Sequence, residues 1–184
     1  KQLYITEIPP VQILAVFFLH NYLEVVEKPH IFVTISILYL LQTIEKMLVA
    51  KEYLEKYGIR PSMQRIAVMQ YLLTHRTHPT VEEIYDAVSR EIPTLSRTTI
   101  YNTLRTLTES GAALSLNIDS SNTRYDGYVA PHAHLMCTRC GRIYDVDLDD
   151  KDFVGRNVPR NAATIHDAQL FYKGICDKCN KQST

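Results

Sequence analysis

Downstream of residue 46, apolar residues recur at the three- and four-residue spacing of amphipathic helices, in stretches separated by Gly and Pro. The clearest stretch has apolar residues at i, i+3, i+4 and i+7, namely Val81, Ile84, Tyr85 and Val88. It is preceded by Thr80, which together with Glu83 has the spacing of a capping box. The pattern therefore predicts a helix that begins at residue 81.

Similar helical patterns flank this one. The earlier helix opens after Pro61 and Ser62, and its apolar face is formed by Ile66, Met69 and Leu73. The later helix starts after Ser96, a favourable N-cap, and ends at Gly111, with a buried face formed by Ile100, Leu104 and Leu107. A further helical pattern, before these three, ends at Gly58. We therefore expect a series of helices joined by short turns.

After Gly111 the apolar period changes to two, which is typical of strands. Apolar residues alternate with small or polar ones at Leu114, Leu116 and Ile118. A polar turn over residues 119–122 leads into a second stretch that contains Thr123, Tyr125 and Tyr128. Three helices followed by a hairpin have the outline of a winged helix.

Residues 1–46 differ from the rest of the chain because they are rich in apolar and aromatic residues. Their two apolar runs, residues 11–19 and 31–41, are each shorter than a transmembrane helix, which needs about 20 apolar residues. We expect residues 1–46 to be a non-native or poorly ordered extension, and a membrane anchor is the alternative. The other predicted domains are a winged helix over residues 47–129 and a dimerisation and zinc-binding domain over residues 130–184.

Composition adds two constraints. The 184 residues, of which 46% are hydrophobic, are enough for two small domains with cores of their own. Basic and acidic residues number 20 each, so the formal net charge is zero, and any nucleic-acid binding must depend on a local basic patch. The four cysteines, with no recognisable signal peptide, indicate a reducing cytosol, where paired cysteines more often hold a metal than form disulfides.

The helix expected over residues 97–110 carries a polar face opposite its buried face, formed by Thr98, Tyr101, Asn102 and Arg105. Arginine and asparagine can read guanine and adenine edges in a major groove, and hydroxyl groups can reach phosphates. An ordinary solvated face is the alternative, and the adjacent hairpin favours DNA. The predicted DNA-binding residues are Arg60, Gln64, Arg65, Arg97, Thr98, Tyr101, Asn102 and Arg105.

Two Cys-x-x-Cys pairs occur in the C-terminal part of the chain, Cys137 with Cys140 and Cys176 with Cys179. Four thiolates suit a tetrahedral zinc ion, and such a closed site is structural because no coordination position stays open. The alternative, four unrelated buried thiols, does not account for the paired spacing. Zinc release on thiol oxidation is a further alternative, secondary to a structural role.

A second ligand set contains nitrogen and oxygen donors. His132 and His134 alternate just before the first Cys-x-x-Cys pair, so a strand would place both imidazoles on one face. His78, Asp126 and Asp145 can complete a set of three nitrogens and two carboxylates. Such a set suits iron(II) or manganese(II), and zinc also fits it. Taken without other information, scattered surface histidines and aspartates are the alternative interpretation.

Five segments together resemble the ferric uptake regulator (Fur) family over residues 47–184: HPTVEEIY from His78, SRTTIYNTLRTLTESG from Ser96, TRYD ending at Asp126, HAHLMCTRCGRIYD from His132, and GICDKC from Gly174. The resemblance implies an α+β protein with an N-terminal winged helix-turn-helix domain and a small C-terminal α/β dimerisation domain with a four-cysteine zinc site. It implies a repressor that binds palindromic operator DNA as a homodimer. It also implies structural zinc at the four cysteines and regulatory iron or manganese at His78, Asp126, His132, His134 and Asp145.

Aspartate at positions 126 and 145 is similar to the peroxide-stress (PerR-like) branch of this family, whereas the iron-uptake regulators usually carry glutamate there. In that branch, bound Fe²⁺ reacts with hydrogen peroxide, a histidine is oxidised and the repressor leaves DNA. The matching oxidation-sensitive residues are His78 and His132. Manganese supports DNA binding without the oxidation. The alternative, with the same residues, is a repressor of iron, manganese or zinc uptake that senses metal occupancy alone.

The chain departs from the family pattern in places. Ala133 and Ala168 stand where iron-uptake members often have ligands of an additional site, so we expect that site to be absent, with His166 as a nearby substitute ligand. Residues 149–163, where the family has its dimerisation helix, contain a glycine and a proline and predict a short or broken helix. No nucleophile or base accompanies the His/Asp set, so we expect no catalytic residues, no small-molecule substrate and no enzyme activity. We expect a regulator located in the cytoplasm.

Overall fold

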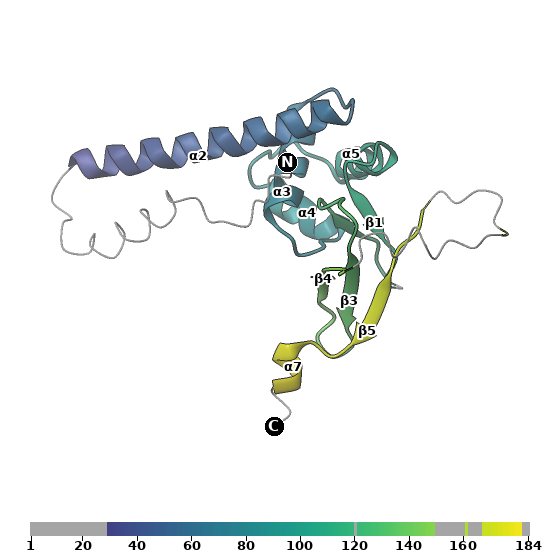
Figure 1. Cartoon of the computed structure of the whole chain (residues 1–184). Coiled ribbons are helices and arrows are strands. Elements are labelled where there is room, and N and C mark those ends of the chain that lie inside the picture. Colours follow the sequence, from purple (N-terminus) through teal and green to yellow (C-terminus); the bar gives the residue numbers. More distant parts are fainter. Residues whose placement is uncertain (1–28, 120, 150–160, 162–166, 182–184) are drawn as a thin grey trace. The chain divides into compact units, whose positions relative to one another are not determined.

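The computed structural model describes residues 29–119, 121–149, 161 and 167–181 (Figure 1). The chain divides into two compact units, Lys1–Ile44 and Glu45–Thr184. The first described helix, α2 (Pro29–Lys56), runs through the boundary between them. The predicted boundary at residue 46 falls within this helix, and the predicted division of the remaining chain near residue 130 stays a prediction.

Helix α2 is longer than its apolar run indicated. By length and composition its segment Val33–Lys56 is long and apolar enough to cross a membrane, which corrects the expectation drawn from the length of the run 31–41. Large apolar side chains along the helix are exposed, among them Tyr39, Leu40 and Leu41. Near its end, Ala50 and Leu54 are fully buried in the core of the second unit. The last turns of α2 are therefore part of that core.

The winged helix begins with three helices, α3 (Met63–Thr74), α4 (Val81–Val88) and α5 (Arg97–Glu109). Each starts at a predicted cap, because the side chains of Ser62, Thr80 and Ser96 each accept a hydrogen bond from the backbone N–H three residues ahead. At α4 the predicted capping box is complete, with Glu83 bonded back to the Thr80 backbone. The predicted caps therefore set the starts of all three helices.

Residue Gly111 ends α5 with a φ of 75°, a left-handed conformation that glycine adopts without strain. The chain then forms the predicted hairpin from β1 (Leu114–Leu116) and β2 (Arg124–Asp126), paired antiparallel. The helices enclose one apolar core, whose fully buried members include Met69, Ile84, Ile100 and Leu104. The predicted pattern of apolar positions thus corresponds to the interior of the winged helix.

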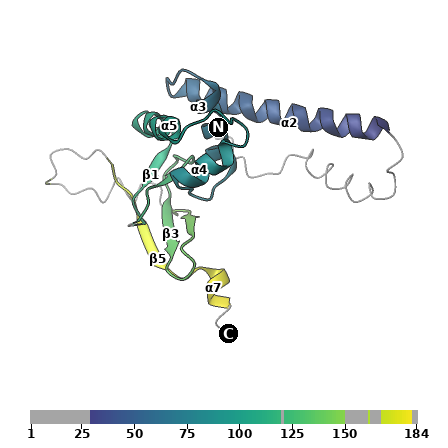
Figure 2. The ribbon, with the colours of Figure 1, turned by 180° about the vertical axis from the view of Figure 1, so that it is seen from behind.

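The C-terminal part contains a three-stranded sheet of order β4-β3-β5, formed by β3 (Ala133–Cys137), β4 (Ile143–Val146) and β5 (Phe171–Gly174). Strand β3 pairs antiparallel with β4 and parallel with β5, and the short helix α7 (Asp177–Lys181) follows. Within the second unit, the three helices lie together while β3 and β5 extend away from them toward α7 (Figure 2).

The hairpin and the sheet share a small core. Leu116, Ile118 and Ile143 are buried together, with Met136 and Phe171 packed against them. The side chain of Gln169 also donates a hydrogen bond to the Ser115 carbonyl, at 2.9 Å. The wing therefore contacts the sheet that follows it. His166 and nearly all of residues 149–163, where a short or broken helix was predicted, lie outside the described residues.

Candidate metal centre and nucleic-acid interface

The five predicted regulatory ligands come together from separate elements of the second unit. His78 lies in the turn between α3 and α4, and Asp126 ends β2. His132 directly precedes β3, and His134 is its second residue. Asp145 is on β4, directly opposite His134 in the register. One nitrogen or oxygen atom from each of the five lies within 4.8 Å of all the others. Four of the side chains are buried, and Asp145 is 20% exposed.

The inner atoms are the three Nε2 nitrogens and one oxygen from each carboxylate. Nε2 of His78 is 2.7 Å from Oδ1 of Asp145, and Nε2 of His132 is 3.0 Å from Oδ2 of Asp126. The Nε2 atoms of His132 and His134 are 2.9 Å apart. Imidazole nitrogens and carboxylate oxygens this close together are a suitable set of ligand atoms for a single cation.

The outer atom of each carboxylate is already engaged. Oδ1 of Asp126 accepts the backbone N–H of Tyr128 at 2.8 Å, and Oδ2 of Asp145 is 2.9 Å from the guanidinium of Arg76. On the imidazole side, Nδ1 of His132 is 2.7 Å from the Ala130 carbonyl, which assigns the proton to Nδ1. This leaves Nε2 free to act as a ligand, the arrangement that outer partners impose at metal sites.

The cluster leaves polar atoms without hydrogen bonds. Oδ2 of Asp126, Oδ1 of Asp145 and both ring nitrogens of His78 are buried and have no hydrogen-bond partner among the described residues. The close approach of His78 to Asp145 is therefore an N···O contact without hydrogen-bond geometry. Unsatisfied buried polar atoms are costly, and a bound cation would satisfy the two carboxylate oxygens and Nε2 of His78 at once. The residues present thus fit a metal ion.

His78 is held in an unusual backbone conformation. Its φ is 52°, the one positive value for a non-glycine residue in the described part of the chain. The guanidinium of Arg124 donates to the His78 carbonyl at 3.3 Å, and the backbone N–H of Tyr125 donates to the Pro79 carbonyl at 3.0 Å. Strand β2 of the wing therefore holds the turn that presents His78 to the cluster.

Carboxylates and imidazoles of the cluster shift each other's pKa toward the charged forms. Burial raises the pKa of Asp126, but the adjacent imidazoles of His132 and His134 and the backbone N–H of Tyr128 outweigh that effect, and the pKa ends well below its usual value. Burial lowers the pKa of His132, and the contact with Asp126 more than reverses this, so the pKa ends above its usual value. The carboxylate is therefore ionised at neutral pH and available to a cation.

The four cysteines form the second cluster, with their sulfur atoms within 4.8 Å of one another. They come from the turn between β3 and β4 and from the segment around α7, and none forms a disulfide. The backbone N–H of Cys176 donates to Sγ of Cys137, and this bond and others lower the Cys137 pKa to about 6. Four cysteine sulfurs this close together fit a zinc ion, which takes four such ligands.

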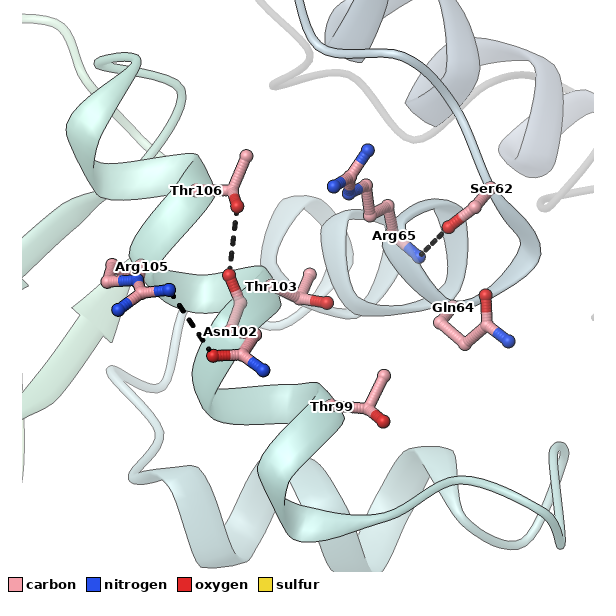
Figure 3. Close-up of a pocket in the computed structure, with 8 residues that line it drawn as sticks. All are labelled: Ser62, Gln64, Arg65, Thr99, Asn102, Thr103, Arg105 and Thr106. Atoms are coloured by element: carbon pink, nitrogen blue, oxygen red, sulfur yellow. Dashed lines mark hydrogen bonds between the residues drawn. The ribbon is translucent and has the colours of Figure 1, made fainter.

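A polar surface lies between α5 and the start of α3 (Figure 3). An open pocket there is lined by Ser62, Gln64, Arg65, Thr99, Asn102, Thr103, Arg105 and Thr106. A second pocket joins α5 to the wing and is lined by Tyr101, Asn102, Arg105, Thr108, Ser115, Asn117, Thr123 and Tyr125. Asn102 and Arg105 line both pockets, and Tyr101 is 52% exposed. The structure thus brings Gln64, Arg65, Tyr101, Asn102 and Arg105 to one continuous surface.

Three other predicted DNA contacts have different surroundings. Arg97 pairs with Glu82 at 2.8 Å and its guanidinium lies 4.2 Å over the ring of Tyr85. Thr98 and Arg60 are exposed and line neither pocket, although the Arg60 carbonyl accepts a hydrogen bond from Arg65.

Sequence reasoning also missed residues that line this surface or support the His/Asp cluster. Thr106, Asn117 and Thr123 line the pockets, and Arg76 and Arg124 contact the His/Asp cluster. Arg76 and Asn117 stand outside the segments that carry the family resemblance, and single polar residues there have no pattern that marks such roles. Thr106, Thr123 and Arg124 stand inside those segments, which was the available signal.

The winged helix and the two ligand clusters define the chain as a winged-helix protein with two candidate metal centres. Residues 56–173 match the model of the ferric uptake regulator family. The chain is 35% identical over 132 residues to the peroxide-responsive repressor PerR of Staphylococcus epidermidis, an alignment that covers 70% of this chain and 87% of the relative. It is 32% identical over 136 residues to the peroxide operon regulator of Bacillus subtilis, with 72% and 92% covered.

The chain therefore belongs to the ferric uptake regulator family of metal-responsive repressors, as its motifs predicted. Among solved structures it is similar to the Campylobacter jejuni peroxide stress regulator, at 28% identity and a TM-score of 0.55, over 76% of this chain and 98% of that one. It also shares the fold of the Helicobacter pylori ferric uptake regulator, at 23% identity and a TM-score of 0.54, over 74% and 92%. These likenesses confirm the predicted α+β architecture.

Proposed function

We propose that this protein is a homodimeric repressor that binds palindromic operator DNA when a metal ion occupies the His/Asp cluster, and that peroxide releases it by oxidation of His78 or His132. The observation that carries the proposal is the composition of the cluster, three imidazole Nε2 atoms and two aspartate oxygens in contact with one another. Named peroxide regulators among its relatives support the same branch.

The proposed metals are zinc at Cys137, Cys140, Cys176 and Cys179, and iron(II) or manganese(II) at His78, Asp126, His132, His134 and Asp145. Soft thiolates suit zinc, and a mixed nitrogen and oxygen set suits iron or manganese. Iron(II), when bound, supplies the one-electron chemistry that activates peroxide, which manganese(II) does not supply. In the net reaction one oxygen atom of hydrogen peroxide is added to an imidazole carbon and the other leaves as water.

The protein's own residues connect the cluster to DNA. His78 directly precedes α4, and Asp126 ends the second strand of the wing, whereas His134 and Asp145 belong to the C-terminal sheet. A metal ion bound by all of these side chains favours one arrangement of the helices relative to the sheet. A preference of about 100-fold between two arrangements corresponds to about 2.7 kcal/mol, which the gain or loss of a ligand can supply.

On the DNA side, α5 is the proposed recognition helix. Tyr101, Asn102 and Arg105 are its exposed polar residues next to the wing, and Arg105 is 3.5 Å from the side-chain oxygen of Asn102. In the proposed complex Arg105 and Asn102 read base edges, while Arg65 and Gln64 from the start of α3 hold phosphates. This role requires a cytoplasmic location, where the operator is.

The test is operator binding by the full chain loaded with iron(II) or manganese(II), measured by fluorescence anisotropy under anaerobic conditions before and after dilute peroxide. We expect both forms to bind and only the iron form to dissociate. Asp126→Asn provides a metal-site control, and Asp147→Asn, an exposed aspartate just after β4, provides a matched control for loss of charge. Release of both forms only by a chelator would contradict peroxide sensing and indicate a sensor of metal occupancy. Failure of both metal-loaded forms to bind DNA would contradict the proposal that the protein is a repressor.

A further inference from the structure

Arg76 contacts the candidate metal centre from outside and is not one of its five candidate ligands. It lies between the end of α3 and His78, and its guanidinium is 2.9 Å from Oδ2 of Asp145. The other oxygen of that carboxylate, Oδ1, faces His78 and His132. Arg76 therefore occupies the one oxygen of Asp145 that the cluster does not use.

A second contact fixes Arg76 in place. Its guanidinium carbon lies 4.1 Å from the ring centroid of Tyr128, a cation–π geometry. The Tyr128 ring is 5.0 Å from the ring of His132, and its backbone N–H binds the outer oxygen of Asp126. The planar guanidinium is thus paired with Asp145 and placed over the Tyr128 ring at once, although its side chain is 48% exposed. Such a contact orients a partner in a way that a mobile charge does not.

In both aspartates the outer carboxylate oxygen is therefore engaged, but by different groups. A backbone N–H engages the outer oxygen of Asp126, and the Arg76 side chain engages the outer oxygen of Asp145. Only the second of these can be removed by substitution of a side chain. Arg76 thus lies at the oxygen of Asp145 that the cluster does not use.

We propose that Arg76 is a positioning residue that limits Asp145 to a single donor oxygen and thereby sets which divalent metal the His/Asp cluster prefers. The inference rests on the proposed function only in taking that cluster as a metal centre. With Arg76 in place the set has three nitrogens and two oxygens. Without it a further oxygen becomes available, and oxygen-rich sites favour manganese(II) over ions with a stronger preference for imidazole, such as cobalt(II).

Selectivity separates this role from a simple charge effect. Removal of a positive charge beside the site raises the affinity for every divalent ion by a similar factor, because the added attraction depends on the ion's charge. A change in the number of available oxygens instead alters the affinities of manganese and cobalt relative to each other. The ratio of the two dissociation constants therefore reports on Arg76 as a positioning residue.

The experiment compares the full-length wild type with Arg76→Ala, Arg76→Lys and Arg90→Ala, each purified with zinc in its four-cysteine site. Manganese and cobalt dissociation constants are measured by titration calorimetry, and the visible spectrum of the cobalt form reports its coordination number. Arg90 is exposed just after α4 and takes part in none of the contacts of the cluster described above.

We expect Arg76→Ala to shift the manganese-to-cobalt preference toward manganese by about 10-fold, a typical effect of losing an outer partner at a metal site. The cobalt spectrum should weaken as coordination number rises. Arg76→Lys, which keeps a donor for Oδ2, should give an intermediate ratio, and Arg90→Ala should match the wild type. An unchanged ratio and spectrum in Arg76→Ala, whatever the absolute affinities, would overturn the inference. Wild type that binds manganese at the cluster but no operator DNA would contradict the proposed function and leave this inference standing.

Discussion

The two ligand clusters differ in how the rest of the protein surrounds them. The four-thiolate cluster gathers its ligands from two short segments near the sheet and α7, and three of its sulfurs belong to buried residues. The His/Asp cluster takes ligands from the turn before α4, from the wing and from two strands of the sheet. The first holds one small part of the fold together, whereas the second joins the DNA-binding helices to the sheet. The proposed structural site and the proposed regulatory site thus differ in what they connect.

The groups that contact the ligands from outside also differ between the two clusters. Around the sulfurs, backbone groups serve as partners, as in the bond from the Cys176 N–H to Cys137. Around the His/Asp cluster, backbone groups of Tyr128 and Ala130 are joined by the side chains of Arg76 and Arg124, which hold a ligand or the turn that carries one. Backbone partners give a rigid site, and side-chain partners give one whose geometry and preference a few substitutions can change.

The largest expected effect is the loss of the thiolate site. Cys176→Ser should abolish zinc binding and unfold the β4-β3-β5 sheet, because structural zinc contributes on the order of 10–16 kcal/mol of apparent binding free energy in small domains. Zinc content by mass spectrometry and thermal unfolding by circular dichroism would check this. Lys178→Ala, an exposed neighbour in α7, is the matched control. A zinc-free Cys176→Ser protein with the wild-type melting temperature would contradict a structural role.

Loss of a His/Asp ligand should leave the fold intact and remove regulation. Asp126→Asn removes a charged donor whose oxygen faces two imidazoles, so manganese affinity should fall by at least about 100-fold, the upper range for an outer partner. Zinc content should stay at the wild-type level. Calorimetry and zinc analysis on the same sample would check both. Equal loss of zinc in this variant would show that the two clusters are not independent.

A more selective change keeps the charge and lengthens the side chain. Asp145→Glu should preserve metal-dependent operator binding but reduce the rate of release by peroxide in the iron form, since the proposed peroxide response depends on aspartate at this position. The comparison of release rates by stopped-flow anisotropy, with Asp147→Glu as the control, tests the branch assignment directly. A variant that keeps the wild-type release rate would leave the aspartates without a special role.

Metal affinity at the His/Asp cluster should rise with pH. The raised pKa of His132 means that its charged form stabilises the metal-free fold below the usual histidine pKa of about 6.5, and that this contribution is lost as pH rises through the raised value. A metal needs the neutral imidazole, so each proton displaced adds about 10-fold in affinity per pH unit over that interval. Manganese titrations between pH 6 and 8 would show this, and a flat profile would contradict the assignment of His132 as a ligand.

The smallest expected effects concern DNA contacts. Arg105→Ala should weaken operator binding by about 1–3 kcal/mol, as expected for loss of a base contact. Arg97→Ala should cost less, because Arg97 already pairs with Glu82 and stacks on Tyr85. The two arginines stand on the same helix, so each controls for the other. Equal losses in operator affinity would mean that the Glu82 pair opens on DNA.

Local signals in the sequence predicted most of the fold. The caps at Ser62, Thr80 and Ser96 and the change of period after Gly111 depend on neighbouring residues, so they can be read directly. The length of α2 could not be read from the sequence, because the apolar run stops at residue 41 while the helix continues to Lys56 through a mixed polar sequence.

The ligand sets divide in the same way. Paired cysteine spacing predicted the thiolate cluster, whereas His78 and Asp145 are far apart in the chain, and only the family resemblance favoured their place in the ligand set over scattered surface residues. The proposed role of Arg76 depends on strand register and on a cation–π contact with Tyr128, neither of which leaves a local pattern in the sequence. Arg97 stood in a favourable helix position, and its partner Glu82 on α4 could not be foreseen from that position.

The most direct test of the account is mass spectrometry of the peptides that contain His78 and His132, taken from the iron-loaded protein after brief exposure to dilute peroxide and compared with the manganese-loaded protein. The account predicts the addition of one oxygen atom to either histidine in the iron form, in step with loss of operator binding, and none in the manganese form. Release of the iron form from DNA with both peptides unmodified, or oxidation of the two forms alike, would contradict it.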